Sequence, residues 1–414
     1  MIYRVYKRVG RNAKVLILTE PFWSIPMNWV FFYRPMFLSI IIGLSPIEIG
    51  LLITMANFFA SVMPILGGYL ADRFGRKITL MLFDSVCWLS STAIWAVSRS
   101  AWHVVLAYII EGLASTIYSV WECLLVEGTG QEFRSAVYGS ISAIWTIGSL
   151  TTPIAGYIIG QYGLDSGCRI LFTIAFCSFI PALIIRLIYL QEPRFSWRLM
   201  GENPFSGIKG YLRSLSMFRR SRALLIALII VVMTGFYFSS YAYVSLYLIH
   251  EDGLGLSENL ASLIPFSSSI VSLTLSLTIM PRIRSRAGCL KTLLAGHSLG
   301  ALAIILLVNS PKGFLPQALL SVALLGSYST SAYSMSRTLL VNQIDSVDER
   351  AKAKTLSLSI TLSSLINLLT PTIMGYLFSL NPKGPFMVIL AAISASTSLL
   401  LILLIHAGKR GAGR

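Results

Sequence analysis

The sequence predicts an all-α membrane protein with twelve transmembrane helices in two pseudo-symmetric bundles of six. Hydrophobic residues make up 55% of the 414 positions and charged residues only 12%, about half the charged share of a soluble domain. Apolar runs of roughly 20 residues, long enough to cross a bilayer, recur from end to end. Because these runs are apolar on all sides, a single soluble core is excluded.

The apolar runs place the helices in order along the chain. Thr19 is the expected cap of the first helix, with Pro21 in its first turn. Residues 1–18 would then form a basic arm on the inner membrane surface. The expected helices cover residues 19–42, 47–71, 78–98, 102–126, 136–160, 168–190, 222–249, 258–281, 289–308, 314–342, 353–379 and 384–407.

The chain divides into two related halves. Residues 191–221 are polar and basic and contain two prolines and three glycines, which indicates a cytoplasmic linker between a bundle at 1–190 and a bundle at 222–414. The run Tyr118–Val126 aligns without gaps to Tyr333–Val341. Further matches link Arg134 and Thr152-Pro153 in the first half with Arg350 and Thr370-Pro371 in the second. The two bundles are therefore expected to be repeats.

The positive charge of the chain gives its orientation. The formal net charge is +16, and almost all of the lysine and arginine lies in the termini, the linker and one set of alternate loops. The opposite loops hold only Arg99, Arg169, Lys312 and Lys383. By the positive-inside rule, both termini and the linker are cytoplasmic in a multi-pass protein of the cell membrane. The excess positive charge is explained by the orientation of the chain in the lipid bilayer, and no nucleic-acid partner is expected.

The turn between the second and third helices carries the most specific motif. It reads Gly68-Tyr69-Leu70-Ala71-Asp72-Arg73-Phe74-Gly75-Arg76-Lys77 and resembles the loop signature of the major facilitator superfamily of transporters. With the two halves and the twelve apolar runs, the resemblance covers essentially the whole chain. It implies a monomeric transporter that moves a small-molecule substrate by rocking one bundle against the other.

The motif also predicts a cytoplasmic latch. Gly68 would let the second helix approach a neighbour closely, Asp72 would accept hydrogen bonds at the start of the eleventh helix, and Gly75 would permit the tight turn. The cations Arg73, Arg76 and Lys77 would stay in water or headgroups, within reach of Glu127 and Glu132.

Two charged residues lie deep in predicted helices. A charge at the centre of a transmembrane helix costs about 2.5–3.5 kcal/mol, so each needs a partner or a function. Arg34 either contacts substrate or a gate, or forms a static internal ion pair. Glu111 is the candidate for a protonatable coupling site. The alternatives for Glu111 are a hydrogen-bonded structural acid and an ion pair with Arg34.

The resemblance implies that helices 1, 4, 7 and 10 line a central cavity. Helical spacing gives two faces toward it: Glu111, Ser115, Tyr118 and Glu122 on the fourth helix, and Gly326, Thr330, Tyr333 and Arg337 on the tenth. Glu122 and Arg337 occupy matching positions with opposite charges. They either pair when the inner gate closes or pair within their own halves.

The seventh helix presents aromatic residues with hydroxyl tips, which suit aromatic or amphipathic solutes. Tyr237 and Tyr241 are the cavity candidates among its tyrosines. Asn28 is a weaker candidate on the first helix. Asp84 and His297 are better explained as satisfied internal polar groups.

These residues favour a secondary transporter of a small organic solute with proton coupling. The alternatives are a facilitative uniporter, or a channel or sensor of transporter ancestry without ion coupling. The sequence contains no catalytic constellation, metal-ligand cluster or nucleotide-phosphate loop, so neither an enzyme nor a cofactor is expected, apart from the proton as coupling ion. The substrate and the direction of transport are not specified by any motif.

Overall fold

The computed structural model describes residues 9–126, 128–192, 218, 221–283, 286–345 and 352–411. All secondary structure in these residues is helical. The chain separates into two compact units, Met1–Glu202 and Asn203–Arg414, called here the first and second unit. The division falls inside the predicted linker, most of which lies outside the described residues, so the domain limits at 190/191 and 221/222 stay a prediction.

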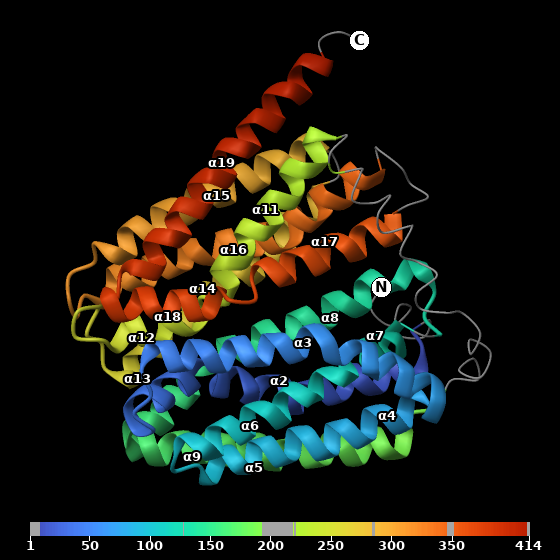
Figure 1. Ribbon diagram of the computed structural model, residues 1–414, viewed down its shortest axis with the longest axis vertical. Coiled ribbons are helices and arrows are strands. Elements are labelled where there is room, and N and C mark those ends of the chain that lie inside the picture. The colour runs from blue at the N-terminus through green and yellow to red at the C-terminus, as the bar shows by residue number, and fades with distance from the viewer. Residues whose placement is uncertain are drawn as a thin grey trace. The chain divides into compact units, whose positions relative to one another are not determined.

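The first unit is built around one long helix. α2 (Arg11–Met36), extended by the π-helical η1 (Phe37–Ile41), lies in the middle of the unit (Figure 1) and packs mainly on α8 and α9. The other elements are α3 (Pro46–Phe74), α4 (Arg76–Phe83), η2 (Asp84–Leu89), α5 (Ser90–Val97), α6 (Ala101–Leu113), η3 (Ala114–Ile117), α7 (Tyr118–Val126), α8 (Gln131–Leu150) and α9 (Thr152–Tyr189).

The start of α2 corrects the prediction that the first helix begins at Thr19. The helix begins at Arg11, so residues 11–18 are not part of a surface arm. Asn12 exchanges two hydrogen bonds of 2.9 Å with the backbone of Gln191, which holds the early turns against the end of α9. The Thr19 hydroxyl donates to the Val15 carbonyl inside the helix and caps nothing. Pro21 lies within α2, as membrane helices tolerate.

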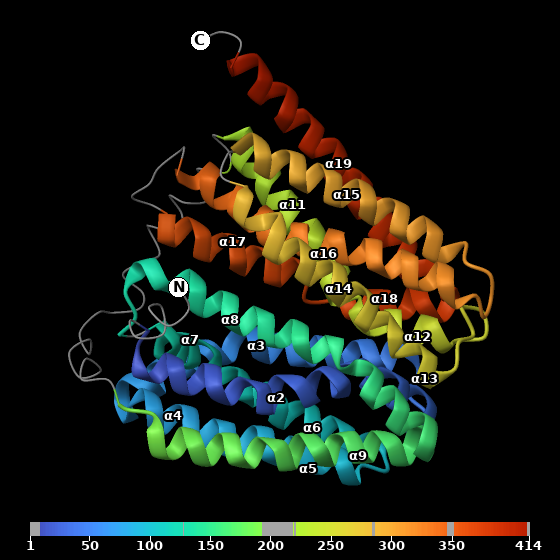
Figure 2. The ribbon, with the colours of Figure 1, turned by 180° about the vertical axis from the view of Figure 1, so that it is seen from behind.

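The chain reverses its direction inside the residue range of α9. Gly163 has φ +74 and ψ 170, a left-handed conformation that glycine adopts without strain. The chain therefore turns at Gly163, and the later part of α9 runs back across the unit (Figure 2).

The second unit is organised around α16 (Leu315–Asp345), which packs on α15, α14 and α11. Its buried core includes Leu224 of α11, Leu290 of α15, Leu339 of α16 and Leu400 of α19. The elements of this unit are α11 (Arg222–Ser239), α12 (Tyr241–Ile249), α13 (Glu258–Ala261), α14 (Leu263–Thr278), η5 (Met280–Arg282), α15 (Arg286–Val308), α16, α17 (Lys352–Ile366), α18 (Thr370–Leu380) and α19 (Gly384–Gly411).

The number of membrane crossings can be compared with the twelve predicted. Among the described residues, ten helical stretches are long and apolar enough to cross a membrane. One of them, Val137–Tyr189, contains the reversal at Gly163. The serine-rich α16 is not among the ten. A many-helix membrane fold is therefore confirmed, and the count of twelve stays a prediction.

Candidate functional site

The signature turn joins α3 directly to α4. Gly75 ends α3 with φ +98, and α4 begins at the next residue. The carboxylate of Glu192 accepts hydrogen bonds from the backbone amides of Arg76 at 2.6 Å and Lys77 at 2.8 Å. The acid thus caps a helix N-terminus, where negative charge is favoured. Sequence analysis missed Glu192, although it is an acid directly after the sixth apolar run.

Of the other residues predicted to form the latch, some have surroundings that the structure describes and others lie outside the described residues. Arg73 donates to the Tyr69 hydroxyl at 3.0 Å. Within the first unit, a Cβ at Gly68 would meet nothing within 4 Å, whereas one at Gly67 would lie 1.8 Å from the Thr116 carbonyl oxygen. Gly67 therefore makes the close approach inside this unit. Outside the described residues lie Glu127, Arg350 and the side chains of Asp72, Glu132 and Arg134.

Arg34 and Glu111 form a buried ion pair between α2 and α6. Arg34 Nη1 lies 3.0 Å from Glu111 Oε1, and Trp95 Nε1 donates to the other carboxylate oxygen at 3.3 Å. The guanidinium also lies 4.6 Å from the Trp95 ring centroid, within cation–π range. One cation and one acid balance each other here. The pairing that the sequence left open for these two residues is thus the arrangement in the structure.

The remaining candidates of the first unit lie on α2, η3 and α7. Asn28 accepts from the Ser149 hydroxyl at 2.7 Å and donates to the Ser24 carbonyl, so it is a satisfied polar group. Ser115 is buried, while Tyr118 and Glu122 are exposed. The face that the spacing predicted therefore runs from a buried end at Ser115 to an open end at Glu122.

In the second unit the tyrosines form an aromatic strip on α11, α12 and α16. Tyr237 is buried, with its ring 5.3 Å from that of Tyr328, whereas Tyr241 and Tyr333 are exposed. Arg337 is exposed and lies 4.8 Å from the Tyr333 ring. Thr330 is partly buried one turn before Tyr333. The structure thus brings together Tyr333 and Arg337, as their helical spacing predicted.

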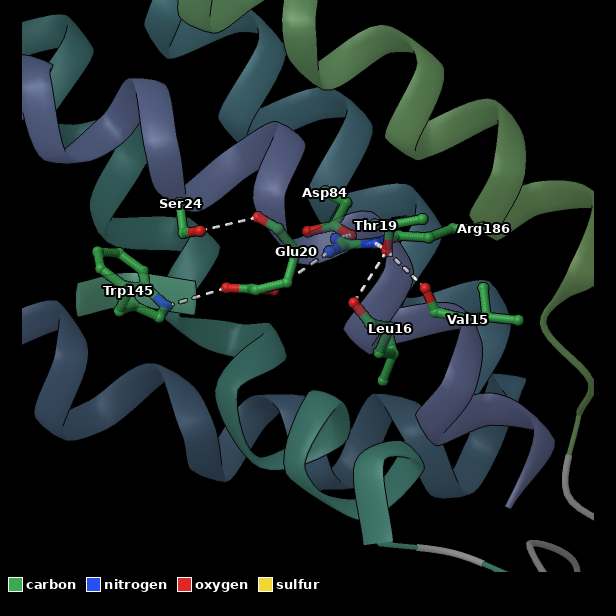
Figure 3. Close-up of polar contacts among 8 residues, drawn as sticks. All are labelled: Val15, Leu16, Thr19, Glu20, Ser24, Asp84, Trp145 and Arg186. Carbon is green, nitrogen blue, oxygen red and sulfur yellow. Dashed lines mark hydrogen bonds and ion pairs between the residues drawn. The ribbon is translucent and has the colours of Figure 1, made fainter. Parts of the chain in front are cut away.

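A second charged cluster, which sequence analysis did not assemble, lies between α2, η2 and α9 (Figure 3). Arg186 Nη1 donates to Asp84 Oδ2 at 2.9 Å, and its Nε donates to the Thr19 hydroxyl at 2.9 Å. Its Nη2 lies 3.6 Å from Glu20 Oε2. Glu20 Oε1 accepts a 3.0 Å hydrogen bond from Trp145 Nε1. The three ionisable residues are at most 3% exposed.

The charges of this cluster do not balance. Two carboxylates face one guanidinium, and the tight partner of Arg186 is Asp84, because its contact with Glu20 is 0.7 Å longer. Glu20 is therefore the excess acid. Sequence analysis placed a helix start at Thr19 and Pro21 and gave no role to Glu20 or Arg186. The available signal was three ionisable residues inside apolar runs, since each is costly there without a partner.

A pocket of about 230 Å³ opens beside this cluster. Its wall is mostly aromatic. The lining residues are Glu20, Trp23, Asp84, Trp88, Ile117, Tyr118, Trp121, Ile141, Trp145, Phe179 and Arg186. An apolar pocket with a few convergent polar groups has the usual construction of a small-molecule site, and this one lies wholly within the first unit.

Comparison with known proteins identifies the family. The sequence profile of the Major Facilitator Superfamily matches residues 24–347, which is more than half of the chain. This chain belongs to the Major Facilitator Superfamily. The resemblance seen in the loop between the second and third helices is thereby confirmed.

Solved structures of other major facilitators show the same fold. The chain superimposes on a crystal structure of the nucleoside transporter NupG with a TM-score of 0.70 and 14% identity, over 96% of this chain and 99% of that one. A proton-dependent oligopeptide transporter gives a TM-score of 0.66 and 15% identity, over 96% and 97%. At these identities the likeness establishes the fold alone.

Curated relatives match over shorter segments. The cis,cis-muconate transport protein of Acinetobacter baylyi is 29% identical over 36% of this chain. A Na(+), Li(+), K(+)/H(+) antiporter of Planococcus maritimus is 23% identical over 44%. The class H tetracycline resistance protein of Pasteurella multocida is 24% identical over 35%. The matches span 36%, 43% and 34% of these relatives' own lengths.

Proposed function

We propose that this major facilitator is a secondary active transporter that moves a small organic solute by alternating access and couples its movement to protons. Membership of the family supports transport. Relatives include one named as a proton antiporter and one named for tetracycline resistance. The solutes named for the relatives differ in chemistry, so the relatives do not select a substrate for this chain.

The observation that carries the coupling is the excess acid in the first unit. Among the described residues, every buried Asp, Glu, Lys or Arg lies in that unit. An unbalanced carboxylate away from water is stabilised when it takes up a proton or another cation. Glu20 therefore supports proton binding better than Glu111, which Arg34 neutralises one to one.

A two-stage experiment tests the transport proposal. Thermal stabilisation of the purified protein against a panel of metabolites and drugs, at two pH values, first identifies a solute. Counterflow of that solute in proteoliposomes is then expected, because an alternating-access carrier exchanges solute across the membrane. A solute that stabilises the protein without counterflow would instead indicate the alternative of a channel or a sensor.

A second measurement tests the proton coupling. A proton gradient should drive solute accumulation in the wild type, with the vesicle interior alkaline for a symporter and acidic for an antiporter. Glu20→Gln should abolish accumulation under both gradients, while counterflow at saturating solute persists. Glu111→Gln is the matched comparison, because it removes the balanced acid. Loss of accumulation in Glu111→Gln but not in Glu20→Gln would assign the coupling site to Glu111. Counterflow without accumulation in the wild type would indicate a facilitative uniporter.

We also propose a monomer in the cell membrane with both termini cytoplasmic. The alternation of basic loops supports this orientation. A terminal tag should be cleaved by protease in inside-out vesicles and protected in right-side-out vesicles, for either end of the chain. Protection of one terminus in the vesicles where the other is cleaved would contradict an even number of crossings.

A further inference from the structure

The pocket of the first unit has an electrostatic preference that its geometry determines. Each nitrogen of the Arg186 guanidinium already has a partner: Nε with Thr19, Nη1 with Asp84, and Nη2 toward Glu20. An anion entering the pocket would meet a guanidinium already bound to Thr19, Asp84 and Glu20 and would face two carboxylates. A cation would meet the excess carboxylate of Glu20, whose Oε1 accepts from Trp145 and whose Oε2 has only the long 3.6 Å contact with Arg186. The pocket therefore favours positive charge.

The wall of the pocket selects the kind of cation. Trp23 lies 4.4 Å from Trp88 and 4.7 Å from Phe179, between ring centroids, and Trp121 and Trp145 complete an indole-rich lining. Aromatic faces attract organic cations, above all quaternary ammonium groups. A bare metal ion needs a shell of oxygen ligands, which this lining does not supply. The lining therefore suits an organic cation better than a metal ion.

The size of the pocket limits the occupant further. A volume of about 230 Å³ is below the range of about 300–1,000 Å³ for drug-sized ligands. A single ring or a comparable aliphatic body fills such a space. The half-exposed Tyr118 is the lining residue most open to its surroundings, and it marks the mouth of the pocket.

We propose that this pocket binds a small monovalent organic cation, with its charge against Glu20 and its apolar body among Trp23, Trp88, Trp121 and Phe179. Glu20 then carries either the cation or a proton. Among the residues that the structure describes, Asp84 of η2 and Arg186 of α9 are the other charged groups that line the pocket, and α8 contributes Ile141 and Trp145. The inference deepens the proposed function and rests on it for the role of the pocket in transport.

Three probes of one shape test the charge preference. Isothermal titration calorimetry of the purified protein in nanodiscs compares (4-hydroxyphenyl)trimethylammonium with its uncharged isostere 4-tert-butylphenol and the anion 4-hydroxybenzenesulfonate. The cation should bind saturably and at least about tenfold more tightly than the isostere. The anion should not bind. Equal affinity for cation and isostere, or preference for the anion, would overturn the proposal.

Two variants locate the binding site. Glu20→Gln should weaken cation binding at least about tenfold and leave the isostere unchanged, because the shape of the pocket is kept while its charge is lost. Trp121→Leu, at the partly buried side of the lining, should weaken the cation several-fold and supplies a second test if Glu20→Gln does not fold. Asp165→Asn, on an exposed carboxylate, is the control that should bind like wild type. Wild-type cation affinity in both pocket variants would refute the site.

The binding test and the transport test fail independently. Cation binding without counterflow of any solute would overturn the proposed function and leave the pocket as a cation site. Counterflow of a solute by a protein that binds none of the cation probe would overturn the pocket inference and leave the transporter intact.

Discussion

Arg186 is the residue on which the polar interior of the first unit depends. Its guanidinium connects Thr19 and Glu20 of α2, Asp84 of η2 and its own helix α9. Asp84 opens a π-helical stretch, a local irregularity that often accompanies functional residues. One side chain thus ties three elements together, and it does so inside an otherwise apolar bundle.

Removing Arg186 should be far more costly than removing an exposed arginine. Arg186→Gln leaves two buried acids without a cation, a type of change that costs about 3–5 kcal/mol. We expect a clearly lower midpoint of thermal unfolding in detergent. Adding Asp84→Asn should restore more than half of that loss, because it removes one unpaired charge.

The control for this prediction is Arg169→Gln. Arg169 pairs with Asp165 at 2.7 Å, but both side chains are partly open to their surroundings, where a pair is worth about 1 kcal/mol or less. Equal losses from Arg186→Gln and Arg169→Gln would show that the buried cluster does not hold the unit together.

At the scale of elements, two helix starts of the first unit are capped by acids in different ways. α3 begins with a local capping box, in which Ser45 and Glu48 hydrogen-bond each other's backbone amides. α4 has no local side-chain cap, and its first amides are satisfied by Glu192, more than a hundred positions away. The signature turn is therefore tied to the end of α9.

Glu192→Gln should loosen the start of α4. The loss of a charged cap costs about 0.5–2 kcal/mol, so amide hydrogen exchange in residues 76–80 should become faster. Glu48→Gln is the matched control, and its effect should be confined to the start of α3. Unchanged exchange at residues 76–80 in Glu192→Gln would contradict the capping role.

The two adjacent glycines of α3 should respond differently to alanine. A Cβ at Gly67 would collide with the Thr116 carbonyl, so Gly67→Ala must push α3 away from η3. Overpacking of this kind costs about 1–3 kcal/mol, visible as a lower unfolding midpoint. Gly68→Ala should leave the first unit as stable as wild type. The reverse order of the two midpoints would show that Gly68, and not Gly67, makes the close approach to η3.

At the scale of the whole molecule, the two units have similar local structure at the positions that the sequence aligns. Each restarts a helix at a Thr-Pro pair, at Thr152 for α9 and Thr370 for α18. Tyr118 and Tyr333 are 48% and 55% exposed. The two units differ at Glu111, because its counterpart is Gly326, which lies close to Ser268 of α14. The second unit thus uses tight packing where the first unit carries charge.

The matched positions of Glu122 and Arg337 allow a test across the units. If they close the inner gate as a pair, Glu122→Arg and Arg337→Glu should each abolish transport by placing like charges together. The double variant should regain it. Transport is measured by counterflow of the solute identified in the stabilisation panel. Failure of the double variant to regain activity would assign the two residues separate roles within their own units.

Sequence analysis predicted features whose cause is local. The turn at Gly75 and the spacing that joins Tyr333 to Arg337 depend on neighbours within a few residues. The start of α2 was mispredicted because Thr19 and Pro21 form a good local cap signal, while the backbone of Gln191 holds the earlier turns in place. Glu20 was missed for the same reason, because its partners are 125 and 166 positions away along the chain.

The amino-acid sequence by itself determined the helical membrane fold and the family, because hydropathy, loop charge and the signature turn are properties of short segments. Only the tertiary structure decided which acids are balanced and which is in excess. That outcome depends on the approach of α2, η2 and α9, since the energy of a buried charge is set by the groups within a few ångströms of it. The aromatic pocket beside Glu20 arises from the same approach.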